Sequence, residues 1–550
     1  MADAPRIPDF GSRLALGGRA ASAWFLAVVV TALLGFLAFV YGRPVSHSAV
    51  FVEDSFVFFD GIHRVAHGKT PHVDFSTPVG ALAYWLPYLG HVLAGGYAGA
   101  IEFASLLLAA VVVPIGAVLI WRRAAPAMAL AVLATIAGII VVPLVPGWVP
   151  EEVSHAMHYN RWSWGVILAL FLLGLPPAPD DPPGWLRGSL AALLLSALFL
   201  TKITYFAVGS VYLILLLAYP DTRRRDAVVA FAGTALMLGI CVVATGGMVF
   251  SYLADLAQAL EVDEAVRGSY LSVAMISRNS LILLVLAAYA AVLKGNLRWQ
   301  DLLVAGYVGA SGLAIIDQNF QYTFIVSLPA AFALLAAPQG TASDAIRIGN
   351  SVIIAACFAM LLPYAADWAR VTLRHMQPAP AGSFTTLDLP GFRGIHVYDR
   401  NKQEPSETST RSGPVDAKAY LRGETKITWL NQRDNLPAFE DGVRLLQSAG
   451  VKDATIFTLD YSNVMPVLVD APREPYGYSW YHFGRNVSEE TLPDGPEMFE
   501  GVDYVMAPLK SYSLVADYFR DIYGDYLAGT LTEVAQSDSW ILFRHAPERD

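Results

Sequence analysis

Two adjacent carboxylic acids, Glu53 and Asp54, follow the first long apolar run of the sequence by about 12 residues. They open a segment, residues 53–80, that reads EDSFVFFDGIHRVAHGKTPHVDFSTPVG. Ionisable groups this close to a bilayer cost free energy unless they serve a function. A carboxylate here could take a proton from a hydroxyl group as a general base, and we assign that role to Asp54, with Glu53 beside it. The other interpretation is a solvated acid or an N-cap of the following helix.

The rest of this segment contains an aromatic run and a turn. Residues 55–67 alternate aromatic and polar side chains, which predicts a helix lying in the membrane interface. Such a helix would hold the acid pair at the depth of the lipid headgroups. A turn rich in Gly and Pro follows around Asp74, which is a candidate substrate-binding residue.

A second polar segment, residues 151–165, reads EEVSHAMHYNRWSWG. Its Arg161 is a candidate partner for a phosphate, because a guanidinium group binds such anions well. Four of its side chains are candidates for polar contacts to a substrate: His155, His158, Tyr159 and Asn160. A belt of interfacial aromatic residues is the simpler interpretation of the same pattern.

A metal ion is an open alternative at this second segment. His155 and His158 are three residues apart, so they could share one face of a helix. Together with Glu151 or Glu152 they could ligate a divalent ion, since imidazole and carboxylate suit several metals. No strong metal-binding motif is present, so the sequence assigns no required cofactor and leaves a divalent metal as the alternative.

Three further positions could contribute to a site on the same side of a membrane. Lys202 interrupts a long apolar stretch, where an ammonium group should find an anion such as a lipid phosphate or snorkel to the surface. Arg267 lies in an amphipathic loop and could bind phosphate, although a solvated helix explains it equally well. Gln318 and Asn319 could hydrogen-bond sugar hydroxyls or cap the next helix.

The composition identifies the class of protein that must position these residues. Charged residues make up 15% of the 550, against roughly 25% in soluble proteins. The mean hydropathy is +0.46. Both values indicate a polytopic α-helical membrane protein. The net charge of −10 argues against a nucleic-acid partner, and the two cysteines, both in apolar runs, indicate no disulfide framework.

Apolar runs of spanning length predict about 11 transmembrane helices. They are expected near residues 21–41, 98–121, 124–145, 162–176, 189–201, 203–219, 227–250, 279–294, 301–316, 321–337 and 348–366. The 30-residue stretch 190–219 is too long for one span, since as a single helix it would measure about 45 Å. Two helices that turn at Lys202 keep the basic loops, including residues 223–225, on one side, and we expect that arrangement.

The chain is expected to have three parts. Residues 1–370 form the transmembrane module, and residues 371–436 form a linker and irregular segment. Residues 437–550 alternate helical and strand patterns, which predicts a water-soluble α/β domain. With the N-terminus inside, this domain and the polar loops lie on the outer side. Polar loops that converge on one face favour interfacial chemistry, because a transport path would place its polar residues near the midplane.

The acid pair after the first helix resembles that of the GT-C superfamily of integral-membrane glycosyltransferases. The segment from Gly68 to Phe75, followed by Pro78 and Gly80, is similar to a motif of the bacterial relatives of protein O-mannosyltransferases and aminoarabinose transferases. The run 159–162 and the Lys202 turn resemble these proteins as well. The resemblance covers roughly residues 20–370. His72 departs from the pattern, which usually has Tyr there.

This resemblance implies a membrane glycosyltransferase with a polyprenyl-phosphate-linked sugar donor and Asp54 as base. The sugar would pass, with inversion, to a hydroxyl of a cell-envelope glycan, lipid or protein. The expected location is the bacterial inner membrane, with the active site and the C-terminal domain on the periplasmic side. A polysaccharide polymerase or ligase that uses lipid-linked oligosaccharide, a lipid-linked sugar transporter and a non-catalytic scaffold are the alternatives.

Overall fold

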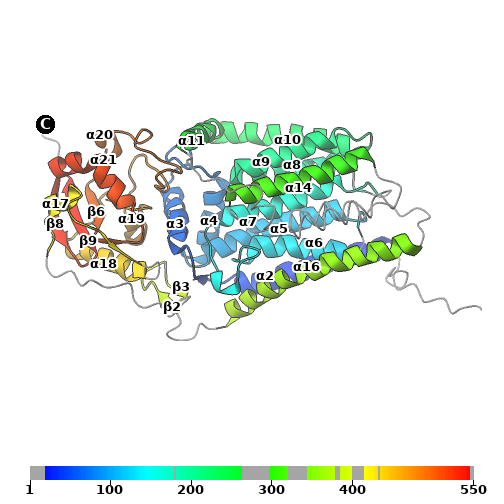
Figure 1. Ribbon diagram of the computed structural model, residues 1–550, viewed down its shortest axis with the longest axis horizontal. Helices are drawn as coiled ribbons and strands as arrows, with labels where there is room; N and C mark the ends of the chain where they lie inside the picture. The colour runs from blue at the N-terminus through cyan, green and yellow to red at the C-terminus, as the bar shows by residue number, and fades with distance from the viewer. Residues whose placement is uncertain are drawn as a thin grey trace, which may run out of the picture.

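The computed structural model describes residues 19–124, 126–178, 181–262, 298–319, 344–377, 384–398, 414–430 and 434–545. Long helices form one bundle, and a smaller domain from the C-terminal third lies at one end of it (Figure 1). The bundle helices are α2 (Arg19–Tyr41), α5 (Ala100–Ile120), α6 (Pro126–Val141), α7 (His158–Phe171), α8 (Gly184–Thr201), α9 (Ile203–Leu216), α10 (Thr222–Ala244), α14 (Trp299–Asn319) and α16 (Asp344–Met376).

Each predicted span that falls on described residues has a helix at its position. The spans predicted at 279–294 and 321–337 lie outside the described residues, so the total of 11 stays a prediction. Within the described chain, five helices are long and apolar enough to cross a membrane: α2, α5, α8, α10 and α14. The α6 and α9 helices are apolar but shorter.

The predicted break at Lys202 is confirmed. Lys202 alone separates α8 from α9, and its extended backbone (φ −158°, ψ 121°) ends one helix and begins the other. Arg187 in the first turn of α8 pairs with Asp226 at the start of α10, at 2.7 Å. The α10 helix follows α9 directly, so α9 must return to the end of the bundle where α8 began. The two helices therefore form a hairpin with Lys202 at its tip.

Four arginines gather at the end of the bundle opposite the Lys202 tip. They are Arg123, Arg187, Arg223 and Arg298. Asp181 lies 2.7 Å from Arg123 and 3.2 Å from Arg187, and Asp221 bridges Arg223 and Arg298. The basic connections thus meet at one end of the bundle, as the charge pattern predicted. Each of these arginines has an aspartate partner there.

Two shorter helices cover the other end of the bundle. The α3 helix (Val52–Ala66) carries the acid pair and stands across the bundle axis, between the bundle and the C-terminal domain (Figure 1). The α4 helix (Leu82–Ala94) packs beneath it, and their close approach requires Gly61, where a Cβ would lie 2.0 Å from the Tyr84 ring. The α11 helix (Met248–Val262) completes this end, and its Tyr252 hydroxyl accepts a hydrogen bond from the backbone N–H of Ile203.

The C-terminal domain has a four-stranded sheet in the order β5-β6-β9-β8. The β5 strand (Ile456–Thr458) pairs parallel with β6 (Tyr504–Pro508), and β9 (Trp540–His545) pairs antiparallel with β6 and with β8 (Leu531–Gln536). Helices α18 (Asn435–Ser448) and α21 (Val515–Thr530) alternate with these strands, as the α/β pattern predicted, and the remaining helices are α17 (Ala417–Leu421), α19 (Val464–Val469) and α20 (Gly495–Met498).

The alternation of side chains along β9 explains how this sheet is covered. Trp540 and Leu542 pack in one apolar cluster with α18 and with bundle residues. Ile541 and Phe543 pack in a separate cluster with α21. Since successive residues of a strand face opposite sides, one helix covers each face. The α18 face continues into the core of the membrane module, and the Phe439 ring lies 4.9 Å from the ring of Phe56 on α3.

Two smaller sheets were not predicted. The β1 strand (Ser46–Ser48), directly after α2, pairs with β3 (Ile395–Tyr398), which also pairs with β2 (Phe384–Thr386). The β4 strand (Thr428–Trp429) pairs with β7 (Lys510–Ser511). Each β1 residue is buried and pairs with a residue almost 350 positions away. Strands this short carry no period-2 signal of their own, because their partners define them.

Candidate functional site

A cavity of about 1230 Å³ lies where the tip of the α8–α9 hairpin, α3 and the C-terminal domain meet. Glu53, Asp54, Tyr159 and Lys202 all line it, although they come from three separate parts of the sequence. Three of the polar regions singled out in the sequence therefore converge on one space. The turn at Pro78 and Val79 also lines it.

The turn before α4, around Gly80, packs directly against the end of α8 beside Lys202. The Gly80 N–H donates to the carbonyl of Thr201, the last residue of α8, at 3.0 Å. A Cβ on Gly80 would lie 2.3 Å from the backbone carbonyl carbon of Leu200. Glycine is required because this close approach leaves no room for a side chain.

The two acids occupy the first turn of α3 and differ in their surroundings. Burial raises the pKa of Asp54 to about 6, against a hydrogen bond from the Tyr461 hydroxyl at 3.3 Å and the nearby Arg485 charge, which both lower it. Burial raises the pKa of Glu53 to about 8, and the neighbouring Asp54 and Asp460 add to the rise. At neutral pH Asp54 is therefore mostly ionised and Glu53 mostly protonated. When two neighbouring carboxyl groups have different pKa values, the group with the lower pKa is the one that is ionised and can act as the base.

Lys202 holds a defined place in the cavity wall. Its ammonium group donates to the side-chain oxygen of Asn160 at 2.9 Å and lies 5.3 Å from the centre of the Tyr159 ring. Asn160 is fully buried on α7, so its hydrogen bond holds the Lys202 ammonium group in a fixed position. Lys202 lines the cavity, where an anionic ligand would meet it.

The C-terminal domain supplies much of the remaining polar and aromatic lining. Its contributions include Tyr461, Trp480, His482, Phe483, Arg485, Tyr512 and Tyr518. The Phe483 and Tyr518 rings are stacked with centroids 4.6 Å apart. Sequence reasoning found none of these residues. Tyr518 lies on α21, and the others lie on irregular connections without a motif, so only their place at the cavity distinguishes them from ordinary loop residues.

The opposite wall of the cavity is apolar. It is formed by side chains of α9, α11 and α14, namely Val208, Leu253, Leu256, Ala257, Leu260, Ala314 and Ile315. Leu260 is 73% exposed and Leu253 46% exposed. The cavity therefore has an acidic and cationic half near α3 and an aliphatic half along the bundle. Such a division suits a ligand with a charged head and a hydrocarbon tail.

Four candidates from the second polar segment lie outside the cavity lining: Asn160, which holds Lys202, and Arg161, His155 and His158. Arg161 is buried and donates to the backbone carbonyl of Val142, so this geometry does not support its predicted contact with a phosphate. His155 Nε2 lies 3.0 Å from a carboxylate oxygen of Glu102 on α5. His158 is buried, with its ring 4.2 Å from Phe58 and 4.4 Å from Trp162. These side chains hold α7 in place, and the two histidines do not share a metal site with Glu151 or Glu152 among the described residues.

Asp74 closes its own turn. Its carboxylate accepts a hydrogen bond from the Thr70 N–H at 2.6 Å, so its predicted contact with substrate finds no support. The neighbouring His72 has a left-handed backbone (φ 67°), and its Nδ1 lies 2.7 Å from Asp255 on α11. Asp255 also accepts from Ser76 Oγ at 2.5 Å. His72 thus ties this turn to α11.

The other candidates remain predictions. Arg267 lies outside the described residues. Gln318 and Asn319 are at the C-terminal end of α14, which reaches the cavity through Ala314 and Ile315. Their side chains are outside the described part of the structure.

No protein-family model matches the sequence, and no curated protein matches it significantly. Solved structures with a similar arrangement do exist. ArnT from Cupriavidus metallidurans in the apo state has 12% identity and a TM-score of 0.45, over 95% of this chain and 98% of that one. ArnT bound to undecaprenyl phosphate gives 12% and 0.45, over 96% and 99%. The Archaeoglobus fulgidus oligosaccharyltransferase gives 13% and 0.41, over 86% and 67%. At these identities and TM-scores, the likeness decides neither the donor, the acceptor nor the site of this chain.

Proposed function

We propose that this protein is a membrane glycosyltransferase of the GT-C type. It moves a sugar from a polyprenyl-phosphate-linked donor to a hydroxyl of a cell-envelope glycan, lipid or protein. The observation that carries the proposal is the divided cavity, which places an acid pair, a lysine and an aliphatic wall within one space. The proposed location is the bacterial inner membrane, with the cavity and the C-terminal domain on the periplasmic side.

The two halves of the cavity fit the two ends of such a donor. The prenyl chain would lie along the aliphatic wall of α9, α11 and α14, in contact with the bilayer. The phosphate would then lie at the tip of the α8–α9 hairpin, near Lys202. Arg485 from the C-terminal domain lines the same cavity and could bind a second phosphate oxygen. In this proposal Arg485 has the phosphate-binding role that the sequence predicted for Arg161.

The proposed reaction is a single displacement at the anomeric carbon. The acceptor hydroxyl oxygen attacks that carbon from the face opposite the phosphate, and its proton passes to the Asp54 carboxylate. The bond between the anomeric carbon and the phosphate oxygen breaks, and polyprenyl phosphate leaves with the electron pair and one added negative charge. Lys202 and Arg485 would stabilise that charge. The configuration of the sugar is inverted.

The function can be tested with the full-length protein in proteoliposomes. A panel of polyprenyl-phosphate sugars and a crude envelope-glycan acceptor would be supplied, and the release of free polyprenyl phosphate would be measured. Release together with a labelled acceptor supports a glycosyltransferase. Lengthening of an oligosaccharide on its lipid would indicate a polymerase, and movement of intact donor across the bilayer would indicate a transporter.

Replacing Lys202 with alanine should weaken donor binding more than it slows the chemical step. A hydrogen bond from a cation to phosphate is worth about 1.5–3 kcal/mol, which predicts a rise in apparent donor KM of about 10- to 100-fold. Donor titrations of transfer rate in proteoliposomes would measure it. Lys452→Ala, which removes an exposed lysine far along the chain, is the control. An unchanged donor KM would show that Lys202 does not meet the phosphate.

The rate of transfer should depend on pH through Asp54. A base works only when ionised, and burial raises the pKa of Asp54 to about 6. The value of kcat/KM should therefore fall as pH decreases through about 6. It should fall again as pH rises above about 7, because burial lowers the pKa of Lys202 to about 7 and the neutral amine binds phosphate less well. Because Glu53 is adjacent to Asp54, the observed acidic pKa belongs to the pair. Initial rates across this range would test the prediction, and a profile that stays flat below pH 6 would contradict it.

A further inference from the structure

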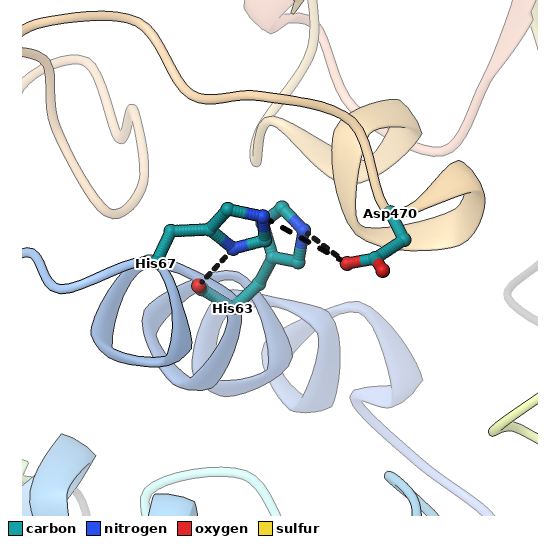
Figure 2. Close-up of side chains that lie close together, drawn as sticks. All are labelled: His63, His67 and Asp470. Carbon is teal, nitrogen blue, oxygen red and sulfur yellow. Dashed lines mark hydrogen bonds and ion pairs between the residues drawn. The ribbon is translucent and has the colours of Figure 1, made fainter. Parts of the chain in front are cut away.

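Three metal-capable side chains meet where α3 contacts the C-terminal domain, apart from the cavity. They are His63 in the last turn of α3, His67 directly after that helix, and Asp470 directly after α19. Figure 2 shows both imidazoles turned toward the Asp470 carboxylate. His63 Nε2 lies 3.2 Å and His67 Nε2 3.9 Å from Asp470 Oδ1. No other such group occurs among the residues that the structure describes.

The hydrogen bonds fix the tautomer of one of these histidines. His67 Nδ1 lies 2.9 Å from the backbone carbonyl of His63. A carbonyl oxygen can only accept, so Nδ1 carries the proton and the Nε2 lone pair of a neutral ring is free. That lone pair faces the carboxylate across 3.9 Å, which is too far for a hydrogen bond. A cation between the two would satisfy both, and a backbone carbonyl behind a ligating histidine is a common way to orient it.

The spacing suits a tetrahedral transition-metal ion. Bonds of about 2.0–2.1 Å to nitrogen and oxygen put neighbouring donor atoms roughly 3.3–3.4 Å apart. The His63–Asp470 pair already has this spacing, at 3.2 Å. The three ligand atoms lie within 4.8 Å of one another, and His67, whose side chain is 35% exposed just after α3, is the one that must come closer to Asp470. Two imidazoles and one carboxylate favour Zn²⁺ and similar ions over Mg²⁺ or Ca²⁺.

We propose that His63, His67 and Asp470 bind a divalent transition-metal ion of the Zn²⁺ class. The ion enters from solvent, because the Asp470 side chain is 85% exposed, and a water molecule completes its coordination. The site joins α3, which carries Asp54, to the C-terminal domain, which carries Tyr461 and Arg485. Metal binding therefore stabilises the arrangement that closes the cavity, without any part in the bond-forming step.

Binding can be measured on the full-length protein in detergent, purified through a tag without histidine and stripped with a chelator. Calorimetric titration with Zn²⁺ should show about one ion bound per chain, and the thermal unfolding midpoint should rise on binding. Mg²⁺ should do neither. In Asp470→Asn and His67→Ala the affinity for Zn²⁺ should drop by about tenfold or more.

Asp453→Asn is the matched control. Asp453 is also an exposed aspartate with a left-handed backbone (φ 47°, against 52° for Asp470), but it lies outside the cluster. Asparagine tolerates this backbone, so both substitutions remove a charge without straining the chain. Comparable metal-free unfolding midpoints would show that the variants fold. The proposal is overturned if Zn²⁺ fails to bind the wild type, or if it binds both cluster variants as tightly as Asp453→Asn.

Discussion

Asp54→Asn lowers the rate of sugar transfer by about 10²- to 10⁴-fold, if this side chain is the general base of the reaction. Asparagine keeps the shape of the side chain and its hydrogen bond from Tyr461, but it cannot take a proton from the acceptor. The loss should therefore fall on kcat, with donor affinity nearly unchanged. Transfer and donor titration in proteoliposomes would measure both quantities.

The adjacent acid offers a sharp comparison for this variant. Glu53 has its pKa raised to about 8, so it is mostly protonated at neutral pH, and glutamine resembles the protonated form. Glu53→Gln should therefore cost much less activity than Asp54→Asn. A larger loss in Glu53→Gln would exchange the roles of the two acids. Near-normal transfer in Asp54→Asn would remove this residue from the mechanism.

Asp60→Ala is expected to destabilise the contact between α3 and the C-terminal domain by about 3–5 kcal/mol. Asp60 is completely buried and receives a hydrogen bond from Arg64 at 2.7 Å and another from Arg473. Glu474 pairs with the same two arginines, so the four charges balance. Removal of one carboxylate leaves two buried guanidinium groups with a single acid between them.

The thermal unfolding midpoint and the rate of proteolysis in detergent would report this loss. Asp388→Ala is the control, since its pair with Arg393 has a similar separation, 2.9 Å, but both side chains are 76% exposed. Exposed pairs contribute about 0–1 kcal/mol, so this variant should be nearly neutral. Equal stability of the two variants would show that the buried network does not hold the domain in place.

The sequence by itself determined the parts of this structure that depend on local chemistry. The apolar runs predicted every described bundle helix, because a bilayer demands length and hydrophobicity from each segment separately. The charge pattern predicted the α8–α9 hairpin, since a single helix would have put the arginines of residues 223–225 on the wrong side. The sequence also identified Glu53 and Asp54 as a candidate site, because two adjacent acids follow the first membrane span closely.

The tertiary structure alone decided which polar residues share the site. Arg161 and Asn160 are neighbours in sequence, yet Asn160 anchors Lys202 while Arg161 binds a backbone carbonyl in the core. Helical geometry turns adjacent side chains about 100° apart, and packing then determines which of them meets the cavity. Tyr461 and Arg485 reach Asp54 from more than 400 positions away, through a domain contact that no local pattern encodes.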